Sequence, residues 1–402
     1  MGHKLPIYMD YHATTPVDPR ALEAMLPFFK ERFGNPASKT HRFGWDAEEA
    51  VERAREQLAA LIGAEPKELI WTSGATESNN LAIHGVARCY RQKGNHLITT
   101  AIEHKSVLYT YKRLAEQGYQ VTVLPVQPDG LLDLDRLREA MTDSTILVSI
   151  MAANNEVGVL QPLREISAIV HERGALLHTD AAQGCGKIPL NVRSLGIDLL
   201  SFTAHKVYGP KGVGALYARR RGKPVELVPL LEGGGHERGL RSGTLNVPAI
   251  VGAGMAAEIA QGEMAEEARR LTSLRERLRQ ALLSQLADIK LNGHPERRLP
   301  GNLSLSFAGV EGEALLMGLH DVALSSGSAC TSANPTPSHV LKAIGLSDAQ
   351  AHSTLRFGLG RYSTAEEVDY AAERTIEVVR RLRELSAPQP APAAADSKPR
   401  WA

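Results

Sequence analysis

The stretch Leu199–Tyr217, LLSFTAHKVYGPKGVGALY, decides the fold. Its apolar run Ile197–Phe202 predicts a strand, residues 203–206 predict the turn that leaves it, and the glycine-rich segment Gly209–Gly214 predicts a second tight bend. This pattern places Lys206 at a strand exit, beside a hydroxyl, an imidazole and exposed backbone amides. A lysine in such a position suits a Schiff base with an aldehyde cofactor, although a lone lysine in a glycine-rich turn is usually a surface residue.

Length and composition favour a globular protein with two lobes and a large core. The chain has 402 residues, 43% of them apolar, and a formal net charge of +1 from 46 basic and 45 acidic residues. Because these charges are interspersed, we expect no direct nucleic-acid or membrane-surface binding. We see neither an apolar leader nor a run of about 18 apolar residues, so we expect a cytoplasmic protein.

The three cysteines, Cys89, Cys185 and Cys330, are too few and too scattered for a disulfide framework. They form no CxxC pair and no cysteine–histidine cluster with zinc spacing. We therefore expect a reducing compartment and no resident metal ion.

From residue 68 to residue 206, predicted strands and helices alternate, which indicates a mainly parallel sheet covered on both faces. Polar residues follow four successive predicted strands. These clusters are Glu103-His104, Asn154-Asn155-Glu156, residues 180–183 and residues 203–206. Ligands bind at the carboxyl ends of such strands, so the four clusters together predict a site.

A small-residue turn at residues 72–80 opens a predicted helix near Thr76, and a helix N-terminus of this kind suits a phosphate. No GxxxxGK[ST] motif supports a P-loop. The glycines Gly252 and Gly254, with Ala257, match GxGxxA, but Pro248 precedes them and a long charged helix (264–286) is predicted after them. We expect these glycines to pack one helix against another.

Other local patterns predict a strand at residues 7–13, a helix at residues 20–32 and a helix at residues 364–385. Ser363 and Glu366 have the spacing of a capping box for the last of these helices. From Ala387 onward proline and alanine dominate, which predicts a disordered tail.

The chain resembles the cysteine desulfurases of the pyridoxal-phosphate-dependent, fold-type-I enzymes over residues 5–386. The motifs that carry the resemblance are SGATESNN, EHKSVL, NNEVG, DAAQ, FTAHKVYGPKG, RSGTLN, SSGSACTSA and AHSTLRFGLGR, in the family's order. It implies an α/β fold with a mainly parallel seven-stranded sheet in a large domain (15–262). A smaller α+β domain (1–14 plus 263–386) would carry the catalytic cysteine loop, followed by the tail (387–402).

The resemblance implies pyridoxal 5'-phosphate as cofactor, held covalently by Lys206. Asp180 would pair with the pyridine nitrogen and Gln183 would donate to the phenolic oxygen, while His104 would stack on the ring and transfer protons. The residues that would hold the cofactor and its phosphate are Ala75, Thr76, Asn155, Thr203 and His205, with Thr244 reaching the phosphate of a partner subunit in a homodimer.

The resemblance also implies L-cysteine as substrate, bound by Asn155, Arg356 and Asn35. Cys330, in a Ser/Gly/Ala-rich loop, would be the nucleophile that takes the sulfur as a persulfide, and it could share an iron–sulfur cluster during transfer. Cys185 is the alternative nucleophile, but a strand end leaves it no room to swing.

The implied function is a cysteine desulfurase that forms L-alanine and supplies sulfur to an iron–sulfur scaffold protein, to tRNA thiolation and to other acceptors. Two alternatives remain open: a related enzyme such as a selenocysteine lyase or aminotransferase, and a catalytically silent sulfur-relay scaffold. The Ala/Pro-rich tail departs from the family's C-terminal extension, which puts docking of a scaffold through the tail in doubt.

Overall fold

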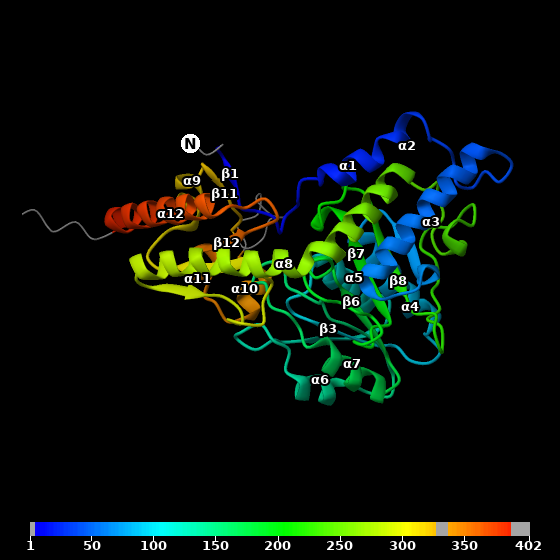
Figure 1. The fold of residues 1–402 in the computed structure, drawn as a ribbon. Helices are drawn as coiled ribbons and strands as arrows, with labels where there is room; N and C mark the ends of the chain where they lie inside the picture. Colours follow the sequence, from blue (N-terminus) through cyan, green and yellow to red (C-terminus); the bar gives the residue numbers. More distant parts are fainter. Residues whose placement is uncertain (1–4, 327–336, 387–402) are drawn as a thin grey trace, which may run out of the picture.

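A computed structural model of the chain describes residues 5–326 and 337–386, and Figure 1 shows its ribbon. Its main feature is a sheet of seven strands in the order β2-β8-β7-β6-β5-β3-β4. Strand β8 is antiparallel to both of its neighbours, and the other four pairs are parallel. The predicted mainly parallel sheet of seven strands is therefore confirmed. The strands are β2 (Leu69–Thr72), β3 (His96–Thr100), β4 (Gln120–Leu124), β5 (Thr145–Ser149), β6 (Leu176–Asp180), β7 (Leu199–Thr203) and β8 (Gly214–Ala218).

Helices cover both faces of this sheet, as the near-continuous apolar strands require. On β7, Leu199 belongs to the core beneath α4 and α5, whereas its neighbour Leu200 belongs to the core beneath α3, α6, α7 and the start of α8. Successive residues of a strand point to opposite faces, so one strand supplies both cores. The covering helices are α3 (Arg42–Ile62), α4 (Ala75–Cys89), α5 (Lys105–Glu116), α6 (Leu134–Ala140) and α7 (Leu163–Glu172).

Helix α8 (Val247–Gln285) joins this sheet to the second part of the molecule (Figure 1). Its first half packs against α3, where a Cβ on Gly254 would lie 2.5 Å from the Cα of Ala54. The expectation that these glycines pack two helices together is confirmed. The charged helix predicted at residues 264–286 is present as the second half of α8, which begins earlier than predicted, at Val247. The second half of α8 supplies Leu271 and Leu278 to another core.

That second core belongs to a three-stranded antiparallel sheet with the order β12-β10-β9. A short parallel pair, β1 with β11, lies beside it and brings the N-terminal segment to this part of the molecule. The strands are β1 (Ile7–Tyr8), β9 (Ile289–Leu291), β10 (Asn302–Phe307), β11 (Val322–Ala323) and β12 (Thr354–Gly358). The helices are α9 (Gly312–Gly318), α10 (His339–Ala343), α11 (Asp348–His352) and α12 (Ala365–Ser386).

Three local expectations are wrong. The strand predicted at residues 7–13 is only β1. The helix predicted at residues 20–32 is two helices, α1 (Pro19–Met25) and α2 (Pro27–Lys30), because Pro27 has no amide hydrogen with which to continue the first. The capping box of α12 lies one residue later than predicted: Thr364 Oγ1 accepts from the Glu367 amide and Glu367 returns the bond, while Ser363 Oγ instead accepts from the Gly360 amide.

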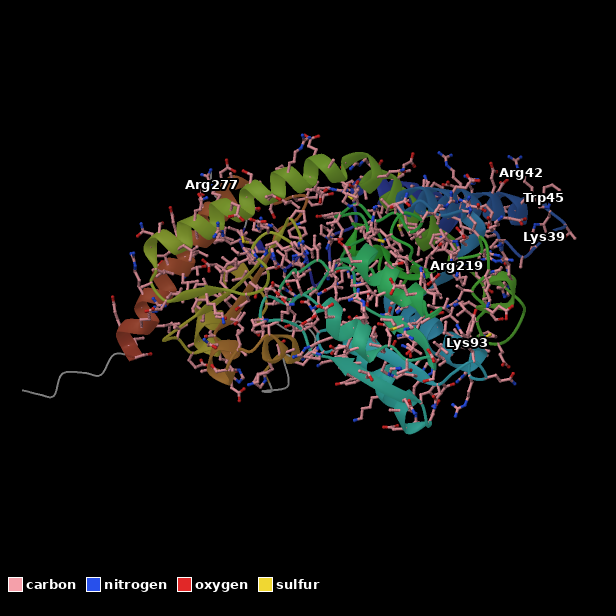
Figure 2. The ribbon with its side chains drawn as sticks, turned by 90° about the horizontal axis from the view of Figure 1, so that it is seen from below. Lys39, Arg42, Trp45, Lys93, Arg219 and Arg277 are labelled. Atoms are coloured by element: carbon pink, nitrogen blue, oxygen red, sulfur yellow. The ribbon has the colours of Figure 1, made fainter. Side chains whose placement is uncertain are left out.

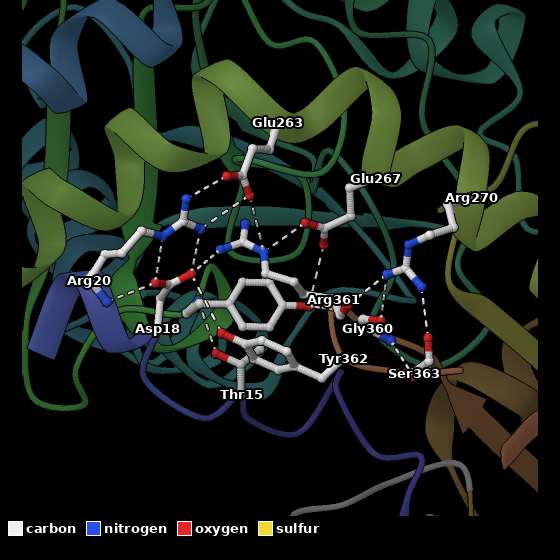
Figure 3. A network of polar contacts seen from close by, with 11 residues as sticks. Thr15, Asp18, Arg20, Glu263, Glu267, Arg270, Gly360, Arg361, Tyr362 and Ser363 are labelled. Carbon is white, nitrogen blue, oxygen red and sulfur yellow. Dashed lines mark hydrogen bonds and ion pairs between the residues drawn. The ribbon is translucent and has the colours of Figure 1, made fainter. Parts of the chain in front are cut away.

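A network of charged side chains fastens the segment after β12 to α8 and to the start of α1 (Figure 3). Arg361 donates to Asp18 at 2.7 Å and to Glu267 at 2.9 Å, and its guanidinium lies over the ring of Tyr208. Arg20 pairs with the same Asp18 and with Glu263. Arg20 and Arg361 share the buried carboxylate of Asp18, so the two parts of the molecule meet in a fixed arrangement at this point. Among the described residues, no helix is long and apolar enough to cross a membrane.

Candidate active site

A cavity of about 660 Å³ lies where β6 and β7 end and the segments after β3 and β5 begin. This volume suits a small-molecule ligand. Ten of the predicted site residues line it: Ala75, Thr76, His104, Asn155, Asp180, Gln183, Thr203, His205, Lys206 and Arg356. The four polar clusters predicted to meet at one sheet edge therefore do meet.

Three predicted site residues are not among those that line the cavity. Asn35 and Thr244 are exposed elsewhere on this chain, and Asn35 uses its side-chain oxygen to accept the amide of Ala37. Cys330 lies outside the described residues, as does the tail 387–402. A role for Asn35 or Thr244 at a cavity would therefore require a second copy of the chain.

Lys206 ends the short 3₁₀ turn η2 (Ala204–Lys206), which follows β7 directly. Its Nζ donates to the carbonyl oxygens of His12 at 2.5 Å and Ala13 at 2.6 Å. The preceding His205 bonds to Thr14 Oγ1, and burial together with the charge of Lys206 lowers the pKa of His205 to about 4. The imidazole is therefore neutral at pH 7, and the lysine amine is held at the floor of the cavity.

Asp180 is the last residue of β6 and is 5% exposed. Its Oδ1 accepts from the amide of Ala182 at 2.9 Å, and its Oδ2 accepts from Asn79 Nδ2 at 2.7 Å. Two donors, one on each oxygen, fix the orientation of this buried carboxyl group. A fixed carboxylate at this depth is suited to hold a protonated ring nitrogen.

The N-terminus of α4 forms another wall. The first intrahelical bond runs from the Ser78 amide to the Gly74 carbonyl, so the amides of residues 75–77 need acceptors from outside the helix. Strand β8 passes close beneath: a Cβ on Gly214 would lie 2.6 Å from the Cα of Gly74. Glycine at 214 thus lets this turn sit against the sheet beside Thr203. Free amides, hydroxyl groups and the helix dipole together make an anion site.

Gln183 is oriented by two residues that the sequence analysis missed. Its Oε1 faces His12 Nδ1 at 3.1 Å and accepts from Lys187 Nζ at 2.9 Å, while its Nε2 donates to the His12 carbonyl. The NH₂ group of Gln183 and the amine of Lys206 therefore donate to the same carbonyl oxygen, that of His12. His12 and Gln183 are 171 residues apart in sequence, so no local sequence pattern predicts their contact.

Arg356 lies on β12 and is 1% exposed. Its two terminal nitrogens donate to the Asn155 carbonyl at 3.0 Å and to Asp10 Oδ1 at 2.7 Å. Its Nε is buried and has no hydrogen-bond partner among the described residues. A buried guanidinium with an unused donor at the cavity edge is suited to a carboxylate ligand.

The other two cysteines differ from the expectation for a nucleophile. Cys185 is 1% exposed in the core of the large sheet, and burial raises the pKa of its thiol to about 12. Cys89 is half-buried, and its Sγ lies 3.8 Å from a carboxylate oxygen of Glu226. Neither residue lines the cavity.

These groups fit pyridoxal phosphate. The cavity holds an amine for its aldehyde, a carboxylate for its ring nitrogen, an oriented amide and an anion site for its phosphate. The unpartnered Nε of Arg356 and Nε2 of His12 are buried polar atoms of the kind that a bound ligand satisfies.

Comparisons with known proteins agree with this geometry. Residues 7–371 match the family model described as aminotransferase class-V, whose members are pyridoxal-phosphate enzymes. The chain is 59% identical over 383 residues to "Cysteine desulfurase IscS" of Anaeromyxobacter sp. (strain Fw109-5), covering 95% of both chains. It is 54% identical to the protein of the same name from Rickettsia bellii (strain OSU 85-389), covering 95% of this chain and 93% of that one.

Solved structures give the same result. A protein titled "NIFS-like protein" superposes with a TM-score of 0.87 at 41% identity, covering 94% of this chain and 100% of the other. Another, titled "SspA in complex with cysteine", gives a TM-score of 0.78 at 38% identity, covering 89% and 100%. With this identity over nearly its whole length, the chain belongs to the cysteine desulfurases of the aminotransferase class-V family.

Proposed function

We propose that this chain is a pyridoxal-phosphate-dependent desulfurase that converts L-cysteine into L-alanine and passes the sulfur to Cys330 as a persulfide. The observation that carries the proposal is one cavity lined by Lys206, Asp180 and Arg356. The fold brings this amine, carboxylate and guanidinium together from the turn after β7, the end of β6 and strand β12. A sulfur-relay scaffold without catalysis has no need for this set.

The bound cofactor would supply an aldehyde carbon and an electron-withdrawing ring. Lys206 would hold it, Asp180 would keep a proton on its ring nitrogen, and Gln183 would donate to its phenolic oxygen. Its phosphate would lie at the N-terminus of α4, against Ala75, Thr76, Thr203 and His205.

Arg356 and Asn155 would bind the carboxylate of L-cysteine and so direct its Cβ–Sγ bond. Because Arg356 is already held by Asp10 and by a backbone carbonyl, its guanidinium is preorganised and the substrate need not order it. The thiolate of Cys330 would then attack the substrate sulfur. The C–S bond breaks, an S–S bond forms, and a proton added at Cβ completes alanine, so the step needs no external oxidant.

We also propose a homodimer. Thr244 is exposed and does not line the cavity of its own chain, which agrees with a role at the partner's phosphate. Large apolar side chains are exposed on α1, α2 and the start of α3, near the end of the molecule where Figure 2 labels Trp45. They are Leu22, Leu26, Phe29, Phe43 and Trp45. An apolar surface of this kind suits burial against a second subunit.

The two packed cores support a division into a large domain (15–262) and a small domain (1–14 plus 263–386). We propose a cytoplasmic location, consistent with three scattered cysteines. As sulfur acceptors we propose an iron–sulfur scaffold protein, a tRNA-thiolation protein or both. Neither acceptor requires a change in the chemistry at the cavity.

The test measures L-alanine formed from L-cysteine in the presence of a thiol reductant. We expect alanine from the wild type and from Cys89→Ala, and no alanine above background from Cys330→Ala or Lys206→Ala. Equal alanine from Cys330→Ala and the wild type would overturn the nucleophile. No alanine from the wild type would overturn the reaction and leave the aminotransferase alternative to be assayed with keto acids.

A further inference from the structure

Asn79 connects two groups of the cavity that are distant in sequence. It lies in the second turn of α4, 0% exposed, between Asp180 at the end of β6 and Ser106 in the first turn of α5. Its Nδ2 is 2.7 Å from Asp180 Oδ2 and 2.8 Å from Ser106 Oγ. An amide nitrogen has two hydrogens and only donates, so each oxygen accepts one of them.

The orientation of this amide follows from the carboxylate. If the amide were rotated by 180°, Asn79 Oδ1 would face Asp180 Oδ2 and two acceptors would repel each other. In the orientation present, Oδ1 is buried without a hydrogen-bond partner among the described residues. A buried acceptor left without a partner is destabilising. We therefore attribute the presence of Asn79 to its two donated hydrogen bonds and not to a gain in stability.

The bond from Asn79 determines where the Ser106 hydroxyl hydrogen points. Because Ser106 Oγ accepts from Asn79, its own hydrogen is available to His104 Nδ1, which lies 2.8 Å away. The backbone amide of Ser106 donates to the same nitrogen at 3.2 Å. Two donors on one ring nitrogen exclude a proton there, so the neutral imidazole carries its proton on Nε2.

We propose that Asn79 is a positioning residue that, through Ser106, holds His104 as a neutral hydrogen-bond donor at Nε2 rather than as a proton acceptor. This inference rests on the proposed function, because it assigns the role of His104 in that cavity. It differs from the proton-transfer role that the family resemblance implies. The ring nitrogen that would accept a proton, Nδ1, is already engaged by Ser106.

The position of His104 supports a neutral ring. It is the N-cap of α5, where the positive end of the helix dipole disfavours an imidazolium ion. His104 interacts electrostatically with His339, which opposes a second proton on the ring, and with Glu156, which favours one. Asp180 is linked to the ring by the chain of hydrogen bonds through Asn79 and Ser106. Bound as a donor, His104 would stabilise negative charge on the substrate or cofactor without changing its own protonation.

The first test reads the ring directly in the holoenzyme labelled with ¹⁵N-histidine. Long-range ¹H–¹⁵N correlation distinguishes a protonated ring nitrogen from a bare one, and His104→Gln identifies the signals of His104 among the 14 histidines. We expect a bare Nδ1 and a protonated Nε2 from pH 6.5 to 8.5. We expect Asn79→Ala to move both signals toward the average of the two tautomers, and the milder Ser106→Ala to move them in the same direction.

Thr110→Val is the matched control. Its hydroxyl also lies between α4 and α5, 2.7 Å from the Ser106 carbonyl and 3.1 Å from Asn80 Oδ1, and neither contact involves the ring of His104. We expect unchanged His104 signals in this variant. A proton on Nδ1 or an imidazolium in the wild type at pH 7.5 would overturn the proposal, as would unchanged signals in both Asn79→Ala and Ser106→Ala.

A kinetic comparison separates a donor from a base. Glutamine keeps an N–H donor but cannot relay a proton, so His104→Gln should retain at least about tenfold more kcat than His104→Ala. Asn79→Ala should lower kcat on the order of tenfold, less than the 10²–10³ that loss of a direct donor costs. Equal loss in His104→Gln and His104→Ala would overturn the donor role. If the wild type forms no alanine, the desulfurase proposal fails while the spectra still decide this one.

Discussion

Two regions beside the cavity hold buried titratable groups of opposite kinds, an amine in one and carboxyl groups in the other. Burial removes water from both. The lysine region comprises His12, Gln183, Lys187 and Lys206, and the glutamate region comprises Glu103, Glu156 and His339. Burial lowers the pKa of Lys187 to about 7, and burial raises the pKa of Glu103 to about 8 and that of Glu156 to about 7. Desolvation therefore brings an amine and two carboxyl groups into the same pH range, where each gains or loses a proton at little cost.

The partners of the two regions differ. Lys187 donates to one amide oxygen, that of Gln183. Glu103 accepts from Thr100 Oγ1 at 2.7 Å and from the Met151 amide at 2.9 Å, while its other oxygen is buried with no partner among the described residues. A buried oxygen without a partner costs less free energy in a neutral, protonated carboxyl group than in a charged carboxylate. Each region therefore predicts its own pH dependence, with opposite sign.

Arg356 connects the two regions, so its replacement gives the largest expected effect. Its guanidinium reaches Asp10 and the Asn155 carbonyl, and its charge also acts on both Glu156 and Lys187. Arg356→Lys keeps the charge but loses the planar fork, so kcat/KM for L-cysteine should fall about 100-fold, mainly through KM. Steady-state alanine formation measures this, with the exposed Arg277→Lys as control. A tenfold or smaller loss would mean that charge alone binds the substrate.

Asp180, His104 and Lys206 show how much of the site the sequence predicts. Each lies at the end of a strand with a clear apolar pattern or shortly after it, so its place at the carboxyl edge of the sheet follows from local sequence. His12 and Lys187 give no such signal. His12 belongs to an N-terminal segment that reaches Gln183 across 171 residues, and Lys187 looks like an ordinary lysine after a turn. Only tertiary packing shows that these two groups lie beside the cavity.

Asn79 and Thr364 show two further limits. Asn79 lies within the SGATESNN motif, but its hydrogen bond to Asp180 joins residues that are 101 positions apart. From its position on a helix alone, one would expect only an exposed residue or a packing contact. The capping box of α12 moves from Ser363 to Thr364 because both residues can cap a helix, and the Gly360 amide takes the serine hydroxyl. Where two neighbouring residues have the same capacity, contacts outside the segment decide between them.

Glu103→Gln tests the glutamate region and has the second-largest expected effect. In the folded protein this carboxyl group keeps its proton up to about pH 8, whereas its ordinary value is 4.5. Between these values the unfolded chain binds fewer protons than the folded one, so the free energy of unfolding falls as pH rises. Glutamine has no proton to lose, so the variant should gain about 2 kcal/mol on the wild type between pH 5 and pH 8.5.

Urea unfolding of the cofactor-free protein at the two pH values measures this gain. The exposed Glu139→Gln on α6 serves as the control and should follow the wild type. A constant difference between Glu103→Gln and the wild type at both pH values would show that Glu103 is ionised in the folded protein across the whole range.

Lys187→Met tests the lysine region and has the smallest expected effect, with the opposite sign. The folded protein releases this proton near pH 7, whereas the ordinary value is 10.5. Between these values the unfolded chain binds more protons, so the free energy of unfolding of the wild type rises with pH. Methionine fills a similar volume without a charge, so the variant should lose its relative advantage by about 1 kcal/mol between pH 7 and pH 10. The same urea experiment applies, with the exposed Lys290→Met as control. A buried amine and a buried carboxyl group change the pH dependence of the free energy of unfolding with opposite sign. If the stability differences of Lys187→Met and Glu103→Gln from the wild type changed with pH in the same direction, the opposite desolvation of the two regions would be wrong.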